Sequence, residues 1–262
     1  MSNLVEVADT KLHVVRRGDG PPLLLVVGLG GRCDFWSGTM DHMSDRFDCI
    51  GFDHRKTGDS IPSDVTTTVE VLAKDAIALM DRLGIARADI IGHSLGGAIS
   101  QHIAVHAPER VGRLVLSASW AGPTPYFKAL FDLRKQVLAN CGPAAYMLQG
   151  NMLGNPGWWA MANHDTMMAG IEARLKSFAG IDIEMERMDA VCGHDLRAHV
   201  PSIRAKTLVI CAQDDGITPL PLSEELARLI PGATLDILST GNHFAPVTTP
   251  GAWRARVDAF LS

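Results

Sequence analysis

The sequence predicts an α/β fold built on a mainly parallel sheet, and two features of its pattern support this prediction. Short β-branched and apolar runs alternate along the chain with amphipathic segments of helical length. Strand–helix–strand units of this kind form right-handed crossovers and therefore parallel sheets. In addition, several of the short runs are apolar throughout, as expected for strands that are buried on both faces of a sheet.

The predicted strands lie toward the two ends of the chain. The first alternates in the manner of an antiparallel strand, whereas the second is a continuous apolar run. In chain order the predicted strands are Leu12–Arg16, Leu23–Val27, Asp48–Phe52, Asp89–Ile91, Leu114–Leu116, Leu208–Ile210 and Thr234–Leu238.

The predicted helices lie between these strands. The segment 69–83 follows a threonine cluster that can cap it and ends at Gly84. Its apolar stripe consists of Val69, Leu72, Ala76, Leu79 and Leu83. A second helix is predicted over 98–106, and a third over 222–230 ends at Pro231-Gly232.

The segment 121–200 interrupts the alternation, because it has helical patterning broken by glycine and proline and no convincing buried strand. We expect a small helical cap here, lying over the carboxyl edge of a core formed by 1–120 and 201–262. Ligands of open α/β sheets bind at that edge, and methionine side chains suit apolar pockets, although methionines also occur often in plain hydrophobic cores. The cap contains Trp158 and Trp159, which we expect to bind substrate, and Met147, Met152, Met161, Met167, Met168, Met185 and Met188.

Composition excludes several classes of protein. The chain has 262 residues, of which 47% are hydrophobic and 20% charged, and its formal net charge is −5. This mild acidity argues against nucleic acid or an anionic membrane as the main partner. No apolar run approaches the roughly 20 residues of a membrane span, and no signal peptide is visible. We therefore expect a cytoplasmic monomer or small homo-oligomer that acts on a small molecule.

The sequence gives no indication of a metal or cofactor. The five cysteines are scattered without a Cys-x-x-Cys pair, which argues against disulfides and a thiolate zinc site. His102 and His106 have the spacing of a metal pair, but no glutamate follows His102 and no third ligand is evident. The glycines of 28–31 do not continue into a dinucleotide fingerprint, because Cys33 stands where a glycine is needed.

The sharpest motif is Gly92-His93-Ser94-Leu95-Gly96, between a predicted strand and a predicted helix. A serine on such a tight turn has a strained backbone and an exposed hydroxyl, and the glycines two positions away prevent steric collisions. The following helix directs its positive N-terminus toward the place where an oxyanion would form. Ser94 is therefore the predicted nucleophile, whereas the side chain of His93 is expected to point away from it.

A serine nucleophile needs a base, and the base needs an acid that orients it. Asp214 and Asp215 directly follow the strand at 208–212, and His243 follows the last predicted strand. All three lie at the carboxyl ends of strands, at the same edge as Ser94. The chain order serine, aspartate, histidine is the order found in one particular fold.

With these motifs, essentially the whole chain resembles the α/β-hydrolase superfamily. The resemblance implies a mostly parallel eight-stranded sheet flanked by helices, with the helical cap inserted before the acid-bearing strand. Residues 212–219 resemble the family's Gly-x-x-Asp-x-x-x-Pro segment with alanine for the glycine, which favours Asp215 as the acid and leaves Asp214 as the second candidate. The loop at 27–31 resembles the family's oxyanion loop without its histidine, which implies that the backbone N–H groups of Leu29 and Leu95 bind the oxyanion.

The turn 53–60 resembles the family's Asp-x-Arg-Gly-x-Gly-x-Ser turn, with Lys56 in a usual glycine position, and is interpreted as structural. Within the superfamily, short motifs are similar to those of aminoacrylate (carbamate-type) hydrolases of pyrimidine degradation, and 3-oxoadipate enol-lactonases share the general plan. The predicted activity is cofactor-free serine hydrolysis of a small ester, lactone, amide or carbamate-like bond.

Two alternatives to hydrolysis of that kind stay open at this point. The same triad could serve a C–C hydrolase, lyase or perhydrolase, or the protein could be a ligand receptor with slow turnover. The cap arginines Arg134, Arg174, Arg187 and Arg197 could include a clamp for a substrate carboxylate or could be solvated surface residues.

Overall fold

A single eight-stranded sheet forms the centre of the computed structural model, which describes residues 3–262. The strand order is β1-β2-β4-β3-β5-β6-β7-β8, with antiparallel pairing of β1 to β2 and of β2 to β4 and parallel pairing elsewhere. The strands are β1 Leu4–Val7, β2 Thr10–Arg17, β3 Pro22–Val26, β4 Asp48–Phe52, β5 Ala88–His93, β6 Val111–Ser117, β7 Lys206–Ala212 and β8 Thr234–Leu238. The prediction of a mostly parallel eight-stranded sheet is confirmed.

Helices cover both faces of the sheet, and side chains of the central strand alternate between the two layers. Leu24 and Val26 of β3 pack into the core on the side of α2 Val69–Arg82, α3 Leu95–His106 and α8 Leu220–Leu229. Leu23 and Leu25 pack into the opposite core, against α1 Ser37–Met43 and α10 Pro250–Phe260. This arrangement explains why β3 reads as a continuous apolar run in the sequence.

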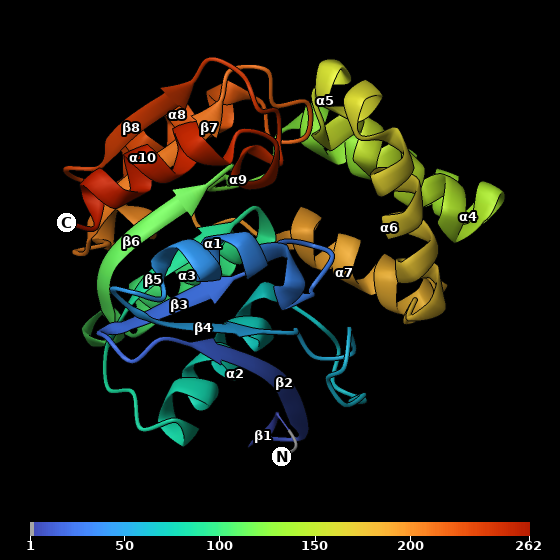
Figure 1. Cartoon of the computed structure of the whole chain (residues 1–262). Helices are drawn as coiled ribbons and strands as arrows, with labels where there is room; N and C mark the ends of the chain where they lie inside the picture. Colours follow the sequence, from blue (N-terminus) through green and yellow to red (C-terminus); the bar gives the residue numbers. More distant parts are fainter. Residues whose placement is uncertain (1–2) are drawn as a thin grey trace.

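The chain between β6 and β7 consists of helices and the loops that join them, and it contains no strand among the described residues. It forms α4 Pro125–Gly154, α5 Gly157–Ala162, α6 His164–Lys176 and α7 Ile181–Gly193. Figure 1 shows α4, α5 and α6 grouped to one side of the sheet, with α7 between them and the core, and the arrowheads of β3 and β6 pointing toward them. These helices lie inside the predicted cap, and the division into two domains stays a prediction. Among the described residues, no helix is both long and apolar enough to cross a membrane.

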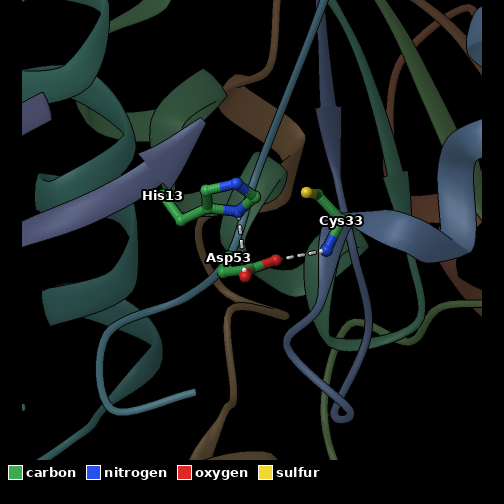
Figure 2. A group of neighbouring side chains, drawn as sticks. All are labelled: His13, Cys33 and Asp53. Atoms are coloured by element: carbon green, nitrogen blue, oxygen red, sulfur yellow. Dashed lines mark hydrogen bonds and ion pairs between the residues drawn. The ribbon is translucent and has the colours of Figure 1, made fainter. Parts of the chain in front are cut away.

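The remaining short helices are η1 Cys33–Trp36, η2 Pro108–Arg110, η3 Val200–Ser202 and α9 Ala245–Thr248. The first of them is tied to β2 by Asp53, which directly follows β4. One oxygen of the Asp53 carboxylate accepts the Cys33 backbone N–H at 2.7 Å, while the other lies 3.1 Å from His13 Nδ1 and 3.0 Å from the Asp59 N–H. Figure 2 shows how His13, Cys33 and Asp53 come together.

This grouping has a structural explanation. The ligand atoms of His13, Cys33 and Asp53 lie within 4.8 Å of one another, a spacing that a metal ion could use. However, both carboxylate oxygens already accept backbone N–H groups, and burial raises the pKa of the Cys33 thiol, which keeps the sulfur protonated. A Cβ on Gly58, whose φ is +58°, would come 2.1 Å from this carboxylate, so the turn requires glycine there.

Candidate active site

Ser94 occupies the turn between β5 and α3 with a strained backbone, at φ 54° and ψ −119°. Its N–H donates to the carbonyl of Ser117 at 2.8 Å. The neighbouring glycines are required by contact: a Cβ on Gly92 would lie 2.4 Å from the Gly96 carbonyl oxygen, and one on Gly96 would lie 2.0 Å from the Val26 carbonyl oxygen. The turn therefore has the geometry that presents a serine hydroxyl at the head of a helix.

His243 and Asp215 are buried together at the ends of β8 and β7, and Nδ1 of His243 lies 2.9 Å from Asp215 Oδ2. The backbone N–H groups of Ile217 and Thr218 both donate to Asp215 Oδ1 at 2.8 Å. The hydroxyl of Thr218 also donates to Oδ2 at 2.8 Å. These three donors fix the position of the Asp215 carboxylate, so Asp215 is fitted to hold His243 in one orientation and tautomer.

Asp214, the second candidate for the acid, serves a different purpose. Its carboxylate accepts the hydroxyl of Thr240 and the N–H of Asn242, each at 2.8 Å, and so holds the loop that carries the histidine. Asn242 has φ 52°, and its side-chain oxygen accepts the N–H groups of His243 and Gly216. The roles of Thr218 and Asn242 were not predicted, because neither residue is marked by a motif of its own.

A cavity of about 180 Å³ lies over these residues, between the sheet edge and the cap. This volume is below the roughly 300–1,000 Å³ of pockets for drug-sized ligands and suits a small substrate. The core side of its wall includes Gly28, Leu29, Phe35, His93, Ser94, His243 and Phe244. The cap side includes Phe131, Arg134, Tyr146, Met147, Asn151, Arg174, Phe178 and Glu184.

The two residues proposed for the oxyanion hole flank the serine. Leu95 is the first residue of α3, where backbone N–H groups have no acceptor within the helix. Leu29 follows β3 and lines the cavity. Its carbonyl accepts two hydrogen bonds from the guanidinium of Arg187 in α7, at 2.6 and 3.0 Å, which fixes this loop against the cap.

Trp158 and Trp159 do not line the cavity. They lie on the short helix α5, where Trp158 is 52% exposed and Ala160 is the residue that packs inward against α6. Phe131, Tyr146 and Met147 of α4 form the apolar cap wall instead. A six-residue helix has too little sequence pattern to show which of its faces meets the core.

Three arginines line the cavity: Arg32, Arg134 and Arg174. Arg32 was not predicted, while Arg187 is buried beside the Leu29 loop and Arg197 pairs with Asp195 at the surface. Arg32 and Arg174 both lie near Asp34, at 3.3 and 3.7 Å.

Arg134 differs from the other two because it is only 7% exposed and forms no ion pair with any residue in the range 3–262. Its guanidinium lies over the rings of Tyr146 at 4.9 Å and Phe131 at 5.5 Å. The carboxylate on this wall, Glu184, accepts the Tyr146 hydroxyl at 2.6 Å. Arg134 is thus a buried cation on the wall of the cavity that Ser94 and His243 also line, and it lies over two aromatic rings.

Two other histidines near the site are neutral. His93 stacks on Phe35 at 4.8 Å, its ring centroid lies 4.9 Å from that of His243, and it lines the cavity. Burial, with a smaller contribution from His243, lowers the pKa of His93 well below its ordinary value. His54 lies 3.2 Å from Arg187, and burial together with that charge lowers its pKa in the same way. Neither is suited to act as the base near neutral pH.

Known proteins resemble this chain over nearly its full length. The sequence profile of a family described as alpha/beta hydrolase fold matches residues 21–141. A protein of Caulobacter sp. (strain K31) named as a carbamate hydrolase, RutD, is 35% identical over 97% of this chain and 96% of its own length. A protein of the same name from Pseudomonas savastanoi pv. phaseolicola (strain 1448A / Race 6) is 32% identical over 96% and 98%. The enol-lactonase of Burkholderia xenovorans LB400 is 26% identical, with a TM-score of 0.87 over 98% of this chain and 99% of that one.

Proposed function

Because this chain belongs to the α/β-hydrolase family and is a hydrolase, we propose that it cleaves a small ester, lactone, amide or carbamate-like bond through an acyl-enzyme on Ser94, without a cofactor. The observation that supports this most directly is the contact of His243 Nδ1 with Asp215 Oδ2 at 2.9 Å, in a site where Ser94 and His243 line one cavity. The names of the two relatives and of the enol-lactonase agree with bonds of this kind.

The proposed reaction has two halves. Ser94 Oγ attacks the substrate carbonyl while His243 Nε2 takes its proton, and Asp215 stabilises the imidazolium that forms. The N–H groups of Leu29 and Leu95 hold the oxyanion, and His243 then gives the proton to the leaving group as the acyl-enzyme forms. In the second half, His243 activates a water molecule that hydrolyses the acyl-enzyme and releases Ser94.

We further propose that the substrate is small and carries a carboxylate. The cavity wall presents three guanidinium groups and one carboxylate, although the chain as a whole has a net charge of −5. Arg134 in particular is desolvated without an acidic partner, and a guanidinium in that state favours a planar anion as its ligand. The carboxylate would lie against α4 while the bond to be cleaved lies over Ser94.

The test of the serine mechanism compares hydrolysis of p-nitrophenyl acetate by the wild type and by Ser94→Ala. We expect kcat to fall at least ~10³-fold, because removal of the nucleophile eliminates the covalent route. The control is Ser44→Ala, whose serine is partly exposed and whose hydroxyl forms only a long hydrogen bond, to the Asp41 carbonyl at 3.4 Å. Mass spectrometry of the quenched wild type should show an added acetyl group that Ser94→Ala lacks. Turnover by Ser94→Ala within tenfold of the wild type would contradict the mechanism.

A further inference from the structure

The hydroxyl of Thr218 lies between the acid and the base of the proposed triad. Its Oγ1 is 2.8 Å from Asp215 Oδ2 and 3.2 Å from His243 Nδ1, and it is also 3.1 Å from the carbonyl oxygen of Ala118. The Thr218 N–H donates to the other oxygen of the same carboxylate at 2.8 Å. One side chain therefore contacts both members of the acid–base pair and a backbone acceptor outside it.

The surroundings of this hydroxyl fix the position of its oxygen. Thr218 has no exposed surface, so bulk water does not compete for its proton. A threonine side chain is stiff about χ1, and the following Pro219 restricts the Thr218 backbone to extended conformations. Ala118, whose carbonyl is the backbone acceptor, is buried and has φ 49°, in the left-handed region. A residue other than glycine keeps such a conformation only where its neighbours impose it, and such residues cluster at active sites.

The Thr218 hydroxyl has two acceptors but only one proton. It can donate to Asp215 Oδ2 or to the Ala118 carbonyl, but not to both at full strength. While it donates to Asp215, it occupies part of the acceptor capacity of the oxygen that holds His243. When it donates to Ala118, that capacity is released, and a lone pair of Oγ1 becomes available to the N–H at Nδ1 of His243. Rotation about the Cβ–Oγ1 bond is enough for this exchange, because only the proton moves.

We propose that Thr218 is a positioning residue whose hydroxyl turns from Asp215 to Ala118 as His243 becomes an imidazolium, and thereby stabilises that cation. This role rests on the proposed serine mechanism. When Ser94 Oγ gives its proton to Nε2, the imidazolium keeps its proton at Nδ1, and Thr218 keeps its own. The turn gives the Nδ1–H group a second acceptor, Oγ1, at the moment when the ring is charged. Hydrogen bonds from a charged donor are stronger than neutral ones, so the contact is worth more in the transition state than in the resting enzyme.

A hydroxyl that only donated to Asp215 would have the opposite effect on the protonation of His243. Such a fixed donor weakens Asp215 as an acceptor for the imidazolium, so its removal would make His243 easier to protonate. A turned hydroxyl accepts from the imidazolium, so its removal makes His243 harder to protonate. The direction in which the acid limb of the pH profile moves therefore distinguishes the two roles.

The other groups that face His243 stay the same in this comparison. Its ring contacts Asp215, in the loop after β7, and lies with its centroid 4.9 Å from that of His93, at the end of β5. Burial lowers the pKa of His93 well below its ordinary value, so this ring stays neutral near pH 7. The charged residues on the cavity wall are Arg32, Arg134, Arg174 and Glu184. None of these groups is altered by a substitution at position 218.

The experiment measures kcat and KM for p-nitrophenyl acetate from about pH 5 to about pH 9 in the wild type, Thr218→Val and Thr218→Ser. Thr218→Val keeps the shape of the side chain and loses the hydroxyl. We expect its kcat to fall ~10-fold, about the worth of one hydrogen bond to a charged group, with KM within about twofold of the wild type. The midpoint of the acid limb of kcat/KM should move to lower pH by roughly half a unit. Thr218→Ser keeps the hydroxyl and should restore both kcat and the midpoint.

Two further variants separate this role from a structural one. Thr240→Val is the matched control, because it removes a hydroxyl that donates at the same distance, 2.8 Å, to the neighbouring Asp214. It is expected to loosen the loop that carries His243 and to leave the midpoint at its wild-type pH. Thr218→Ala removes the hydroxyl with a smaller side chain and should move the midpoint in the same direction as Thr218→Val. Circular dichroism checks that each variant is folded.

The pH midpoint also decides against the turning hydroxyl if it behaves otherwise. A midpoint that stays in place or moves to higher pH in Thr218→Val and Thr218→Ala would overturn the role, as would a loss of kcat that Thr218→Ser does not restore. If Ser94→Ala is inactive in the same assay, only the role of Thr218 has failed. If Ser94→Ala keeps its activity, the serine mechanism has failed as well.

Discussion

Arg134 is the residue to which we assign the proposed preference of the cavity for a carboxylate. Its guanidinium lies over the rings of Tyr146 and Phe131, which contact it without neutralising it. Burial also raises the pKa of Tyr146, so this phenol stays protonated and can donate to Glu184. The cap side of the cavity therefore keeps the positive charge of Arg134 available to a bound anion.

The first prediction concerns this charge. Arg134→Met should lower kcat/KM for mono-p-nitrophenyl succinate at least ~10-fold more than for p-nitrophenyl acetate, because only the first ester has a carboxylate to lose its partner. Arg134→Lys keeps the charge and should be intermediate. Arg204→Met, which changes an exposed arginine, is the control. Equal losses on the two esters in Arg134→Met would show that Arg134 does not bind a substrate carboxylate.

The proposed catalytic residues were predictable from short motifs. Ser94 stands between Gly92 and Gly96, and Asp215 and His243 lie in loops after strands whose ends meet at one edge. The pocket residues of α4 have no such motif. Arg134 and Tyr146 lie on either side of a break at Gly142, where φ is 81°, so no single helical period relates them.

At the scale of elements, the N-terminus of α3 depends on its close approach to β3. The backbone of Gly96 packs against the Val26 carbonyl, at a distance that no side chain could occupy. The sequence predicts that this helix begins at residue 98, because glycines at 96 and 97 are poor helix formers in isolation, whereas in the structure it begins at Leu95. β1 was missed because it has four residues, of which only Val7 is buried.

Two matched glycine substitutions test this contact. Gly96→Ala should lower the free energy of unfolding by about 1–3 kcal/mol and reduce kcat, since the added methyl group must displace backbone beside the oxyanion hole. Gly170→Ala in α6, where nothing lies within 4 Å of the new Cβ, should raise stability by about 0.5–1 kcal/mol. Urea unfolding measures both, and a stable, fully active Gly96→Ala protein would be inconsistent with the packing described.

At the scale of the whole molecule, four histidines are held neutral by burial. Burial lowers the pKa values of His54, His93, His102 and His194 below the ordinary value of 6.5. Between the folded and unfolded pKa values, the unfolded chain binds more protons than the folded one. The stability that comes from keeping these histidines neutral is therefore complete above about pH 6.5, and it is lost as the pH falls below that value.

The corresponding prediction is a loss of stability under mildly acidic conditions. The urea midpoint of unfolding should decrease steadily from pH 7 to pH 5, before paired carboxylates with lowered pKa values such as Asp9 and Asp195 begin to protonate. His102→Gln should flatten this dependence, whereas His164→Gln should not. A midpoint that stays constant down to pH 5 would show that protonation of the buried histidines does not lower the stability of the folded state.

The contacts of helix α7 limit how the cap of this fold can be exchanged. Arg187 holds the carbonyl of Leu29, and the neighbouring Glu186 binds Lys56 of the 53–60 turn at 2.9 Å. Lys56 itself adopts φ 62°, the conformation of the glycine usual at that position. Exchange of the cap for that of another hydrolase would therefore remove the support of the loop at Leu29 along with the old pocket. New specificities should arise more readily by substitutions in α4 than by recombination of whole caps.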